Sequence, residues 1–190
     1  MLPSLLALMA VPSVSLAAAP VFAVVPSGSS VTFNVKASVP IQGRFDKWTS
    51  SLTFTSPDIS TGVLLVKVDA DSVNTGSGMK DGTLKSGSFF DVKNNPVISF
   101  RSTGITQTGT NNFAVAGIFT IRGVSKPQTV VLTTTGRGAS SGSIKGTMSF
   151  NRKDYGMNSS IPLVKIADYV GVTLDLKVKR VSGPPVALKP

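Results

Sequence analysis

The segment LKSGSFFDVKNNPVISF, from Leu84 to Phe100, brings an aromatic pair, a turn and the start of a strand into direct succession. Phe89 and Phe90 are neighbours, so their rings point to opposite sides of an extended chain, or diverge by about 100° in a helical turn. Both rings therefore cannot line one surface. We expect one ring to anchor the segment from beneath and the other to reach into the interior that the strands enclose.

The turn that follows has clear residue signals. Asn94 and Asn95 tolerate turn backbones, and Pro96 biases the residue before it towards an extended conformation. From residue 97 to 101 apolar and polar side chains then alternate, which is typical of a strand with one buried face.

Period-two alternation of this kind recurs along most of the chain from Val21. It is clearest in residues 31–36, 52–55, 64–71, 113–121, 144–150 and 172–179. Gly, Ser, Thr and Asn separate these segments, so we expect antiparallel neighbours joined by hairpins. The apolar face must be buried by closure or by a second sheet, and we predict an all-β, antiparallel barrel of about eight strands.

Alternation stops between Val73 and Val92, where four glycines accompany few apolar residues. A long irregular connection in a compact domain is usually functional or disordered, and glycines weaken a helix. We predict a lid over one mouth of the barrel, either a long loop or a short helix around Met79 to Leu84. Gly117 and Gly146 fall on the inward register, which favours an interior cavity; a filled core with bent strands is the alternative.

Composition restricts the chemistry. The 190 residues suit one domain, and they include no His and no Cys, while all nine acidic residues are Asp. Imidazole-dependent triads, thiolate clusters and Glu-based acid/base pairs are excluded, so we predict no catalytic residues and no cofactor. Asp69 and Asp71 lie two apart on one strand, and we expect solvated carboxylates there rather than a metal site.

The net charge of +10 favours anionic partners, such as phosphorylated lipids or a transiently contacted membrane surface. Simple solubility is the alternative, because the basic residues are scattered along the chain. No basic stripe interleaved with aromatic residues is present, so nucleic acid is not an expected partner.

The two ends of the chain differ from its middle. Residues 1–19 are uncharged, mostly apolar and end in Ala17-Ala18-Ala19, as in a signal peptide that is removed on export. We therefore expect a mature domain at 20–182 in the periplasm or in the secreted fraction. Residues 183–190, GPPVALKP, are predicted to be a disordered tail.

Several motifs, in this order, resemble those of the YceI-like, polyisoprenoid-binding, lipocalin-like proteins. They are SSVTF at 29–33, GRF at 43–45, Lys80, Asp81, Leu84, Lys85 and Ser86 before FFDV at 89–92, PVISF at 96–100, TIRGV at 120–124 with Lys126-Pro127, and NRKDYGM at 151–157. The resemblance covers roughly residues 22 to 181. Gly28 and Thr83 stand where the family often has histidines, so no imidazole role carries over.

The resemblance implies a lipocalin-like barrel that holds a long apolar lipid, of the polyisoprenoid class. Candidate cavity residues are Phe33, Phe45, Trp48, Phe54, Leu84, Phe89, Phe90, Phe100 and Phe119. Candidate head-group residues at the rim are Arg44, Lys85, Arg122 and Arg152. For Arg152, a turn braced by an Arg–Asp pair is the alternative reading.

Three function classes follow. The first is carriage, storage or sequestration of the lipid outside the cytoplasm, and it is the one that we prefer. The second is a secreted stress-response or structural barrel without lipid. The third is an enzyme acting on isoprenoid lipids, for which no acid/base pair or nucleophile spacing is apparent.

Overall fold

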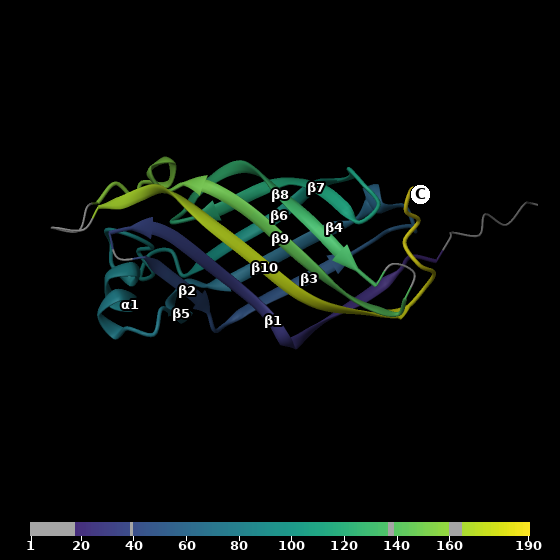
Figure 1. The fold of residues 1–190 in the computed structure, drawn as a ribbon, viewed down its shortest axis with the longest axis horizontal. Helices are drawn as coiled ribbons and strands as arrows, with labels where there is room; N and C mark the ends of the chain where they lie inside the picture. The colour runs from purple at the N-terminus through teal and green to yellow at the C-terminus, as the bar shows by residue number, and fades with distance from the viewer. Residues whose placement is uncertain (1–17, 39, 137–138, 160–164) are drawn as a thin grey trace, which may run out of the picture.

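The structure, a computed structural model, describes residues 18–38, 40–136, 139–159 and 165–190. In these ranges one α-helix and ten strands surround a single interior (Figure 1). The strands are β1 (Val21–Ala37), β2 (Ile41–Phe45), β3 (Trp48–Thr53), β4 (Val63–Asp69), β5 (Val73–Asn74), β6 (Val97–Gln107), β7 (Asn112–Ile121), β8 (Val124–Thr135), β9 (Ser141–Asn151) and β10 (Ile166–Ser182). The helix is α1 (Gly78–Lys85), and short 3-10 turns are η1 (Ile59–Thr61), η2 (Ala70–Ser72) and η3 (Arg152–Tyr155). No helix among the described residues is long and apolar enough to cross a membrane.

All strands belong to one antiparallel sheet in the order β3-β4-β6-β7-β8-β9-β10-β1-β2-β5. The two-residue link Asp46-Lys47 joins β2, near one end of this order, to β3 at the other end, so the sheet curls round on itself. Two main-chain bonds of 3.0 Å secure the link, from Asp46 N to the Ser72 oxygen and from Asp69 N to the Lys47 oxygen. The predicted all-β antiparallel barrel is confirmed.

The number of strands exceeds the predicted eight or so. The link at residues 46–47 divides the segment from Gly43 to Thr49 between β2 and β3, which lie near opposite ends of the strand order. The strand β5 has only two residues, which pair with Arg44 and Phe45, and such a short strand has no alternation to detect.

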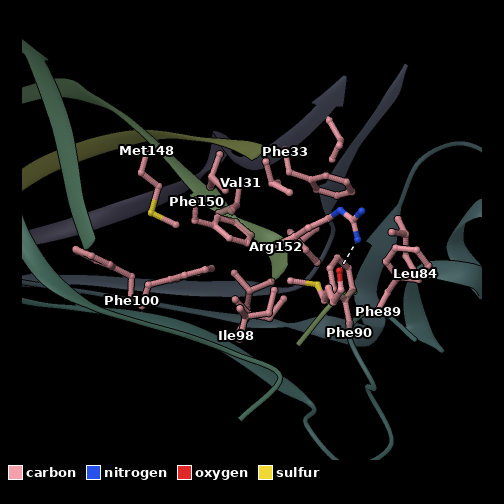
Figure 2. Close-up of a pocket in the computed structure, with 18 of the residues that line it drawn as sticks. Val31, Phe33, Leu84, Phe89, Phe90, Ile98, Phe100, Met148, Phe150 and Arg152 are labelled. Carbon is pink, nitrogen blue, oxygen red and sulfur yellow. Dashed lines mark hydrogen bonds between the residues drawn. The ribbon is translucent and has the colours of Figure 1, made fainter. Parts of the chain in front are cut away.

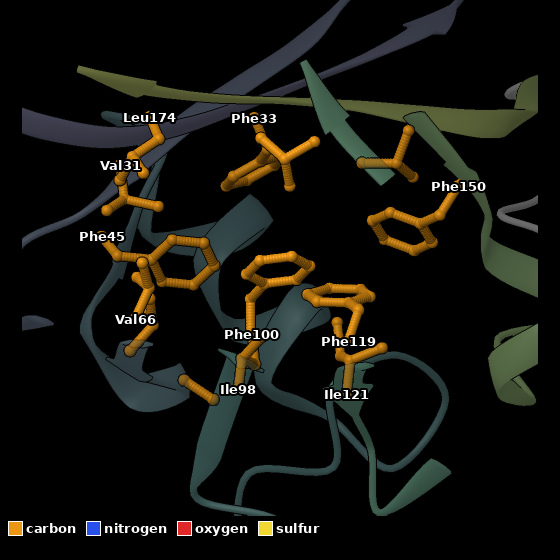
Figure 3. Packing of buried hydrophobic residues seen from close by; sticks show 14 of the residues in the cluster. Val31, Phe33, Phe45, Val66, Ile98, Phe100, Phe119, Ile121, Phe150 and Leu174 are labelled. Carbon is orange, nitrogen blue, oxygen red and sulfur yellow. The ribbon is translucent and has the colours of Figure 1, made fainter. Parts of the chain in front are cut away.

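Apolar side chains of the inward register fill much of the interior (Figure 3). Phe119 and Phe150 pack with ring centroids 5.0 Å apart. A Cβ built on Gly117 would lie 2.5 Å from Cζ of Phe100, so the space that this glycine leaves is occupied by a ring rather than by a cavity. For Gly117 the prediction of vacant interior space is therefore wrong.

The two ends of the barrel are different (Figure 1). The helix α1 and the turn η3 lie at one end, and the carboxyl terminus lies at the other. The tail was predicted to be disordered, whereas Ala187 N donates to the Pro57 oxygen at 2.8 Å and Lys189 N donates to Oε1 of Gln107 at 2.8 Å. Residues 1–17, which hold most of the expected signal peptide, lie outside the described residues.

Candidate functional site

A cavity of about 360 Å³ occupies the α1 end of the barrel (Figure 2). Its wall is almost wholly aliphatic and aromatic, and it comes from nearly every strand as well as from α1. Besides the aromatic residues, the aliphatic lining includes Val31, Val35, Ile41, Leu64, Val66, Val68, Leu84, Ile98, Ile121, Val130, Val170, Val172 and Leu174. Such a wall suits an apolar molecule, because it offers few hydrogen-bond partners to a polar one.

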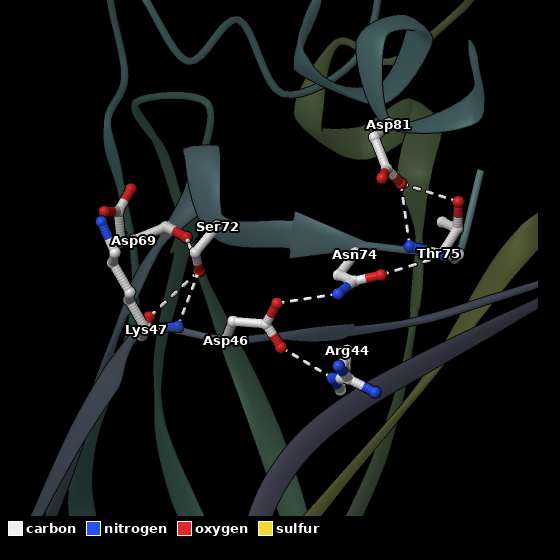
Figure 4. A network of polar contacts seen from close by, with 9 residues as sticks. Arg44, Asp46, Lys47, Asp69, Ser72, Asn74, Thr75 and Asp81 are labelled. Carbon is white, nitrogen blue, oxygen red and sulfur yellow. Dashed lines mark hydrogen bonds and ion pairs between the residues drawn. The ribbon is translucent and has the colours of Figure 1, made fainter. Parts of the chain in front are cut away.

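The predicted lid is present, and it contains the short helix α1. Oδ1 of Asp81 accepts hydrogen bonds from Thr75 N at 2.8 Å and from Thr75 Oγ1 at 2.7 Å (Figure 4). These bonds hold the first turn of α1 to the residue that follows β5. At the other end of the helix, Nζ of Lys85 lies 3.2 Å from Oδ1 of Asp71. Leu84 is buried beneath the helix and lines the cavity.

Both rings of the aromatic pair line the cavity, and both are buried. The expectation that they could not share one surface is wrong. Phe89 N donates to the Ser86 oxygen and Phe90 N to the Leu84 oxygen, so the segment forms a tight turn across the mouth. A cavity that surrounds such a turn can meet two rings that point in different directions.

The two rings have different neighbours. The centroid of the Phe90 ring lies 6.3 Å from that of Phe33 and 6.0 Å from that of Phe45, which makes Phe90 part of an aromatic cluster. The main chain of Phe89 is instead attached to the barrel, because Nη1 of Arg122 donates to its carbonyl oxygen at 2.9 Å. Phe90 is therefore the ring with closer aromatic packing.

The turn after the pair is built as the sequence indicated, with one addition. Asp91 has a φ of 51°, an uncommon value for a residue other than glycine. Its carboxylate accepts hydrogen bonds from the side-chain amides of Asn94, at 3.0 Å and 3.1 Å, and of Asn95, at 3.1 Å. These bonds hold the turn that leads into β6.

Seven of the nine residues predicted for the cavity line it: Phe33, Phe45, Leu84, Phe89, Phe90, Phe100 and Phe119. Trp48 and Phe54 do not. Trp48 packs against the core at the start of β3, and Phe54 lies towards the other end of the barrel, with its ring centroid 5.8 Å from that of Phe22. Aromatic character alone does not show which end of a barrel a residue occupies.

Three of the four predicted rim cations do not line the cavity. Nε of Arg44 donates to Oδ1 of Asp46 at 2.7 Å on the outer surface (Figure 4), Lys85 pairs with Asp71, and Arg122 holds the Phe89 carbonyl. Hydrogen bonds from Arg44 and then Asn74 lower the pKa of the Asp46 carboxyl. These cations fasten parts of the fold to one another.

Arg152 does line the cavity, and it is only 6% exposed. Its guanidinium donates to the carbonyl oxygens of Met157, of Ser159 at 3.1 Å and of Ala167 at 3.2 Å, and Nη2 lies 3.5 Å from Oδ1 of Asp168. Most of its N–H groups are thus engaged, by carbonyls of the segment that follows η3 and by Ala167 and Asp168 of β10. The alternative reading, a turn braced by an Arg–Asp pair, holds only in part, because the aspartate is Asp168 on β10 rather than Asp154 in the turn, and the hydrogen bonds go to carbonyl oxygens.

Sequence reasoning missed the polar residues of α1 at the cavity. Lys80 and Thr83 line it together with Met79. Helical spacing could have identified them, because residues three and four apart share one face of a helix. Lys80 precedes the inward-facing Leu84 by four residues. Gly146 also lines the cavity, although Leu132 and Val130 lean towards the space above it.

Other chemistry near the cavity is limited. Tyr155 is fully buried against the rings of Phe119 and Phe150, and this burial raises the pKa of its phenol despite a hydrogen bond from Gln128. Within the described ranges, no group of three or more Asp side chains could hold a metal ion. The arrangement can enclose an apolar molecule and place Lys80 and Arg152 beside it.

The fold and the cavity thus define a lidded antiparallel β-barrel with an apolar interior site. A family model described as YceI-like domain matches residues 22–178, and the chain belongs to this family. The resemblance inferred from the motifs is confirmed.

Known relatives and solved structures are consistent with this assignment. A UPF0312 protein of Pseudomonas aeruginosa is 29% identical over 126 residues, and the match covers 64% of this chain but only 65% of that protein. A UPF0312 protein of a Shewanella species is 27% identical over 160 residues, covering 80% and 82% of the two chains.

Among solved structures, Burkholderia cenocepacia BcnA superposes with a TM-score of 0.74 at 25% identity, covering 82% of this chain and 99% of that one. A polyisoprenoid binding domain from Saccharophagus degradans superposes with a TM-score of 0.65 at 15% identity, covering 85% and 99%. At that identity the second likeness concerns the fold.

Proposed function

We propose that the protein binds a long-chain apolar lipid, of the polyisoprenoid class, in the cavity at the α1 end. The observation that carries this proposal is the cavity itself, with about 360 Å³ of space, an aliphatic and aromatic wall and a hydrogen-bonded lid. Water molecules in such a space find few hydrogen-bond partners. An apolar chain that enters it removes its own apolar surface from water, which is favourable. The described polyisoprenoid binding by a protein of this fold supports the choice of lipid class.

A polar head group would lie at the mouth rather than inside. Lys80 and Arg152 are the charged residues that line the cavity, and no carboxylate lines it within the described ranges. Lys80 forms no salt bridge with a described residue, so its ammonium group can meet a phosphate or pyrophosphate, while Arg152 retains little of its donor capacity. Lys80 therefore replaces Arg44, Lys85 and Arg122 as the principal head-group candidate.

Transient contact with a membrane surface would let the lipid enter and leave. Met79 is 85% exposed although it also borders the cavity, and the cationic Lys80 follows it on α1. An exposed apolar side chain beside a cation suits the interface of an anionic membrane. In this proposal the α1 end faces the membrane during transfer.

We further propose that carriage, storage or sequestration takes place outside the cytoplasm, in the periplasm or the secreted fraction. The uncharged apolar segment at residues 1–19 and its Ala17-Ala18-Ala19 end support export. N-terminal sequencing of the protein from each fraction tests this. We expect a start after Ala17 or Ala19 outside the cytoplasm; an intact Met1 there would exclude cleavage, and recovery only from the cytoplasm would exclude export.

Lipid binding is tested first by mass spectrometry of organic extracts from the purified protein, and then by titration with a fluorescent polyprenyl phosphate. Val172 lines the cavity, so Val172→Phe fills part of it and should weaken probe binding at least tenfold. Val131→Phe, at an exposed position on β8, is the matched control.

The results also separate the alternatives. A barrel without lipid predicts empty extracts and no saturable binding. An enzyme predicts conversion of the polyprenyl probe into a product, which the same mass spectra would detect. Equal binding by Val172→Phe and the wild-type protein would exclude the cavity as the site.

A further inference from the structure

A second cavity, of about 330 Å³, lies at the opposite end of the barrel from α1. Its apolar wall includes Phe22, Leu52, Phe54, Ile105 and Phe113. We call it the tail-end cavity, because Pro185, Val186 and Leu188 of the carboxyl-terminal tail also line it.

Solid packing separates the two cavities. Along the inward register of β10, Leu174 lines the first cavity, Val178 lines the tail-end cavity, and Leu176 between them lines neither and is fully buried. On β7, Val115 is likewise fully buried between Phe113 of the tail-end cavity and Phe119 of the first. Among the described residues, Leu64 alone borders both cavities. The tail-end cavity is therefore a separate compartment.

The tail forms a fixed wall of this compartment. Ala187 bridges to Asp58 and donates its N–H to the Pro57 oxygen, while Gln107 exchanges two hydrogen bonds with the main chain of Lys189, at 2.8 Å and 3.0 Å. Residues 184–188 alternate between half-buried and exposed, and the half-buried Val186 and Leu188 line the cavity. The tail lies beyond residues 22–178, so the YceI-like match does not include this wall.

The rim of the tail-end cavity is polar. Among the described residues that line it, Arg180 is the charged one, and hydroxyl groups of Thr134, Thr135, Ser141 and Ser143 stand nearby. Nη1 of Arg180 donates to the Gly183 oxygen at 2.6 Å, and no Asp in the described ranges forms a salt bridge with this guanidinium. Its remaining N–H groups can meet an anion at the edge of an apolar space.

We propose that the tail-end cavity is a second ligand site, which takes a single-chain amphiphile with an anionic head group, of the fatty-acid type. The alkyl chain lies among Phe22, Phe54 and Phe113, and the head group meets Arg180. This site does not depend on the lipid proposed for the first cavity.

Isothermal titration calorimetry with decanoate, and with decanol as its uncharged analogue, tests the proposal. Thr134 lies on the inward register of β8 and lines the cavity, so Thr134→Phe should remove one class of decanoate sites. It should leave polyprenyl phosphate binding at the first cavity unchanged. Val172→Phe should have the opposite pattern.

Arg180→Gln gives a second and milder test. Loss of a charge-assisted hydrogen bond should weaken decanoate binding at this site about tenfold and leave decanol binding within about twofold of the wild-type value. Deletion of residues 184–190 should weaken both ligands, because it removes an apolar wall.

Folding of each variant is checked by circular dichroism and urea unfolding. The proposal is overturned if folded Thr134→Phe binds decanoate with wild-type stoichiometry and affinity, or if Arg180→Gln affects decanoate and decanol equally. If Val172→Phe alone removes all decanoate binding, only the first cavity binds and the second site is excluded. Failure of polyprenyl binding at the first cavity would leave these comparisons unaffected.

Discussion

Arg122 fastens Phe89 to the barrel, because its Nη1 donates to the Phe89 carbonyl oxygen at 2.9 Å. Arg122 and Gly123 have φ values of 55° and 72° and form the tight turn between β7 and β8. A residue suggested by its charge as a head-group contact thus positions the aromatic pair instead.

Replacement of this arginine should loosen the lid. Asn tolerates positive φ, so Arg122→Asn removes the hydrogen bond without much backbone strain. We expect a loss of about 1 kcal/mol in the free energy of unfolding and weaker polyprenyl binding. Urea unfolding and fluorescence titration measure the two effects. Lys145→Gln, which removes one positive charge at an exposed position, is the control, and equal behaviour of the two variants would show that charge alone is responsible.

Of the aromatic pair, Phe90 should contribute mainly to the stability of the fold and Phe89 mainly to lipid binding. Phe90 packs against Phe33 and Phe45, so Phe90→Ala should cost about 3 to 5 kcal/mol in the free energy of unfolding. Phe89→Ala should cost clearly less and should mainly weaken polyprenyl binding, since an unliganded cavity gives its ring fewer packing partners. Urea unfolding without lipid and probe titration give both values. If both variants unfold readily while their folded fractions bind normally, the pair belongs only to the core.

Two glycines provide a matched test of interior and lid. A Cβ at Gly117 would lie 2.5 Å from Phe100 and 2.6 Å from the Arg101 oxygen, whereas a Cβ at Gly82 would meet nothing within 4 Å. Gly117→Ala should therefore destabilise the protein by about 1 to 3 kcal/mol through overpacking. Gly82→Ala should stabilise α1 by up to about 1 kcal/mol. Urea unfolding measures both, and a neutral Gly117→Ala would show that Phe100 has room to move.

Asp46 should contribute a pH-dependent part of the stability. Its carboxylate accepts bonds from Arg44 at 2.7 Å and from Asn74 at 2.8 Å, which hold its pKa below the usual value of 3.8. Since the folded pKa is the lower one, the contribution is present above pH 3.8 and is lost as the pH falls through the folded pKa. Carboxyl titration by NMR should give a midpoint below 3.8, and Arg44→Gln should move it upwards. A midpoint at or above 3.8 in the wild-type protein would contradict the assignment.

Local patterns were sufficient for much of the fold. Alternation along segments such as 113–121 and 172–179 records which side chains face inwards, because successive residues of a strand point to opposite faces. Glycine and polar turns between these segments indicated antiparallel hairpins, and the motifs around Phe89 and Phe90 indicated the family. Seven of the predicted cavity residues followed from these signals.

Other features depended on contacts between residues far apart in sequence. Alternation gives the face on which a side chain lies but not its height along the barrel axis, so Phe54 of the tail-end cavity could not be distinguished from the residues of the first cavity. The group with which an arginine or lysine side chain pairs likewise depends on which strands and turns the fold brings next to it. Arg122 reaches Phe89 and Gln107 reaches Lys189 only because the sheet curls, and the same curvature fills the space above Gly117 with the ring of Phe100.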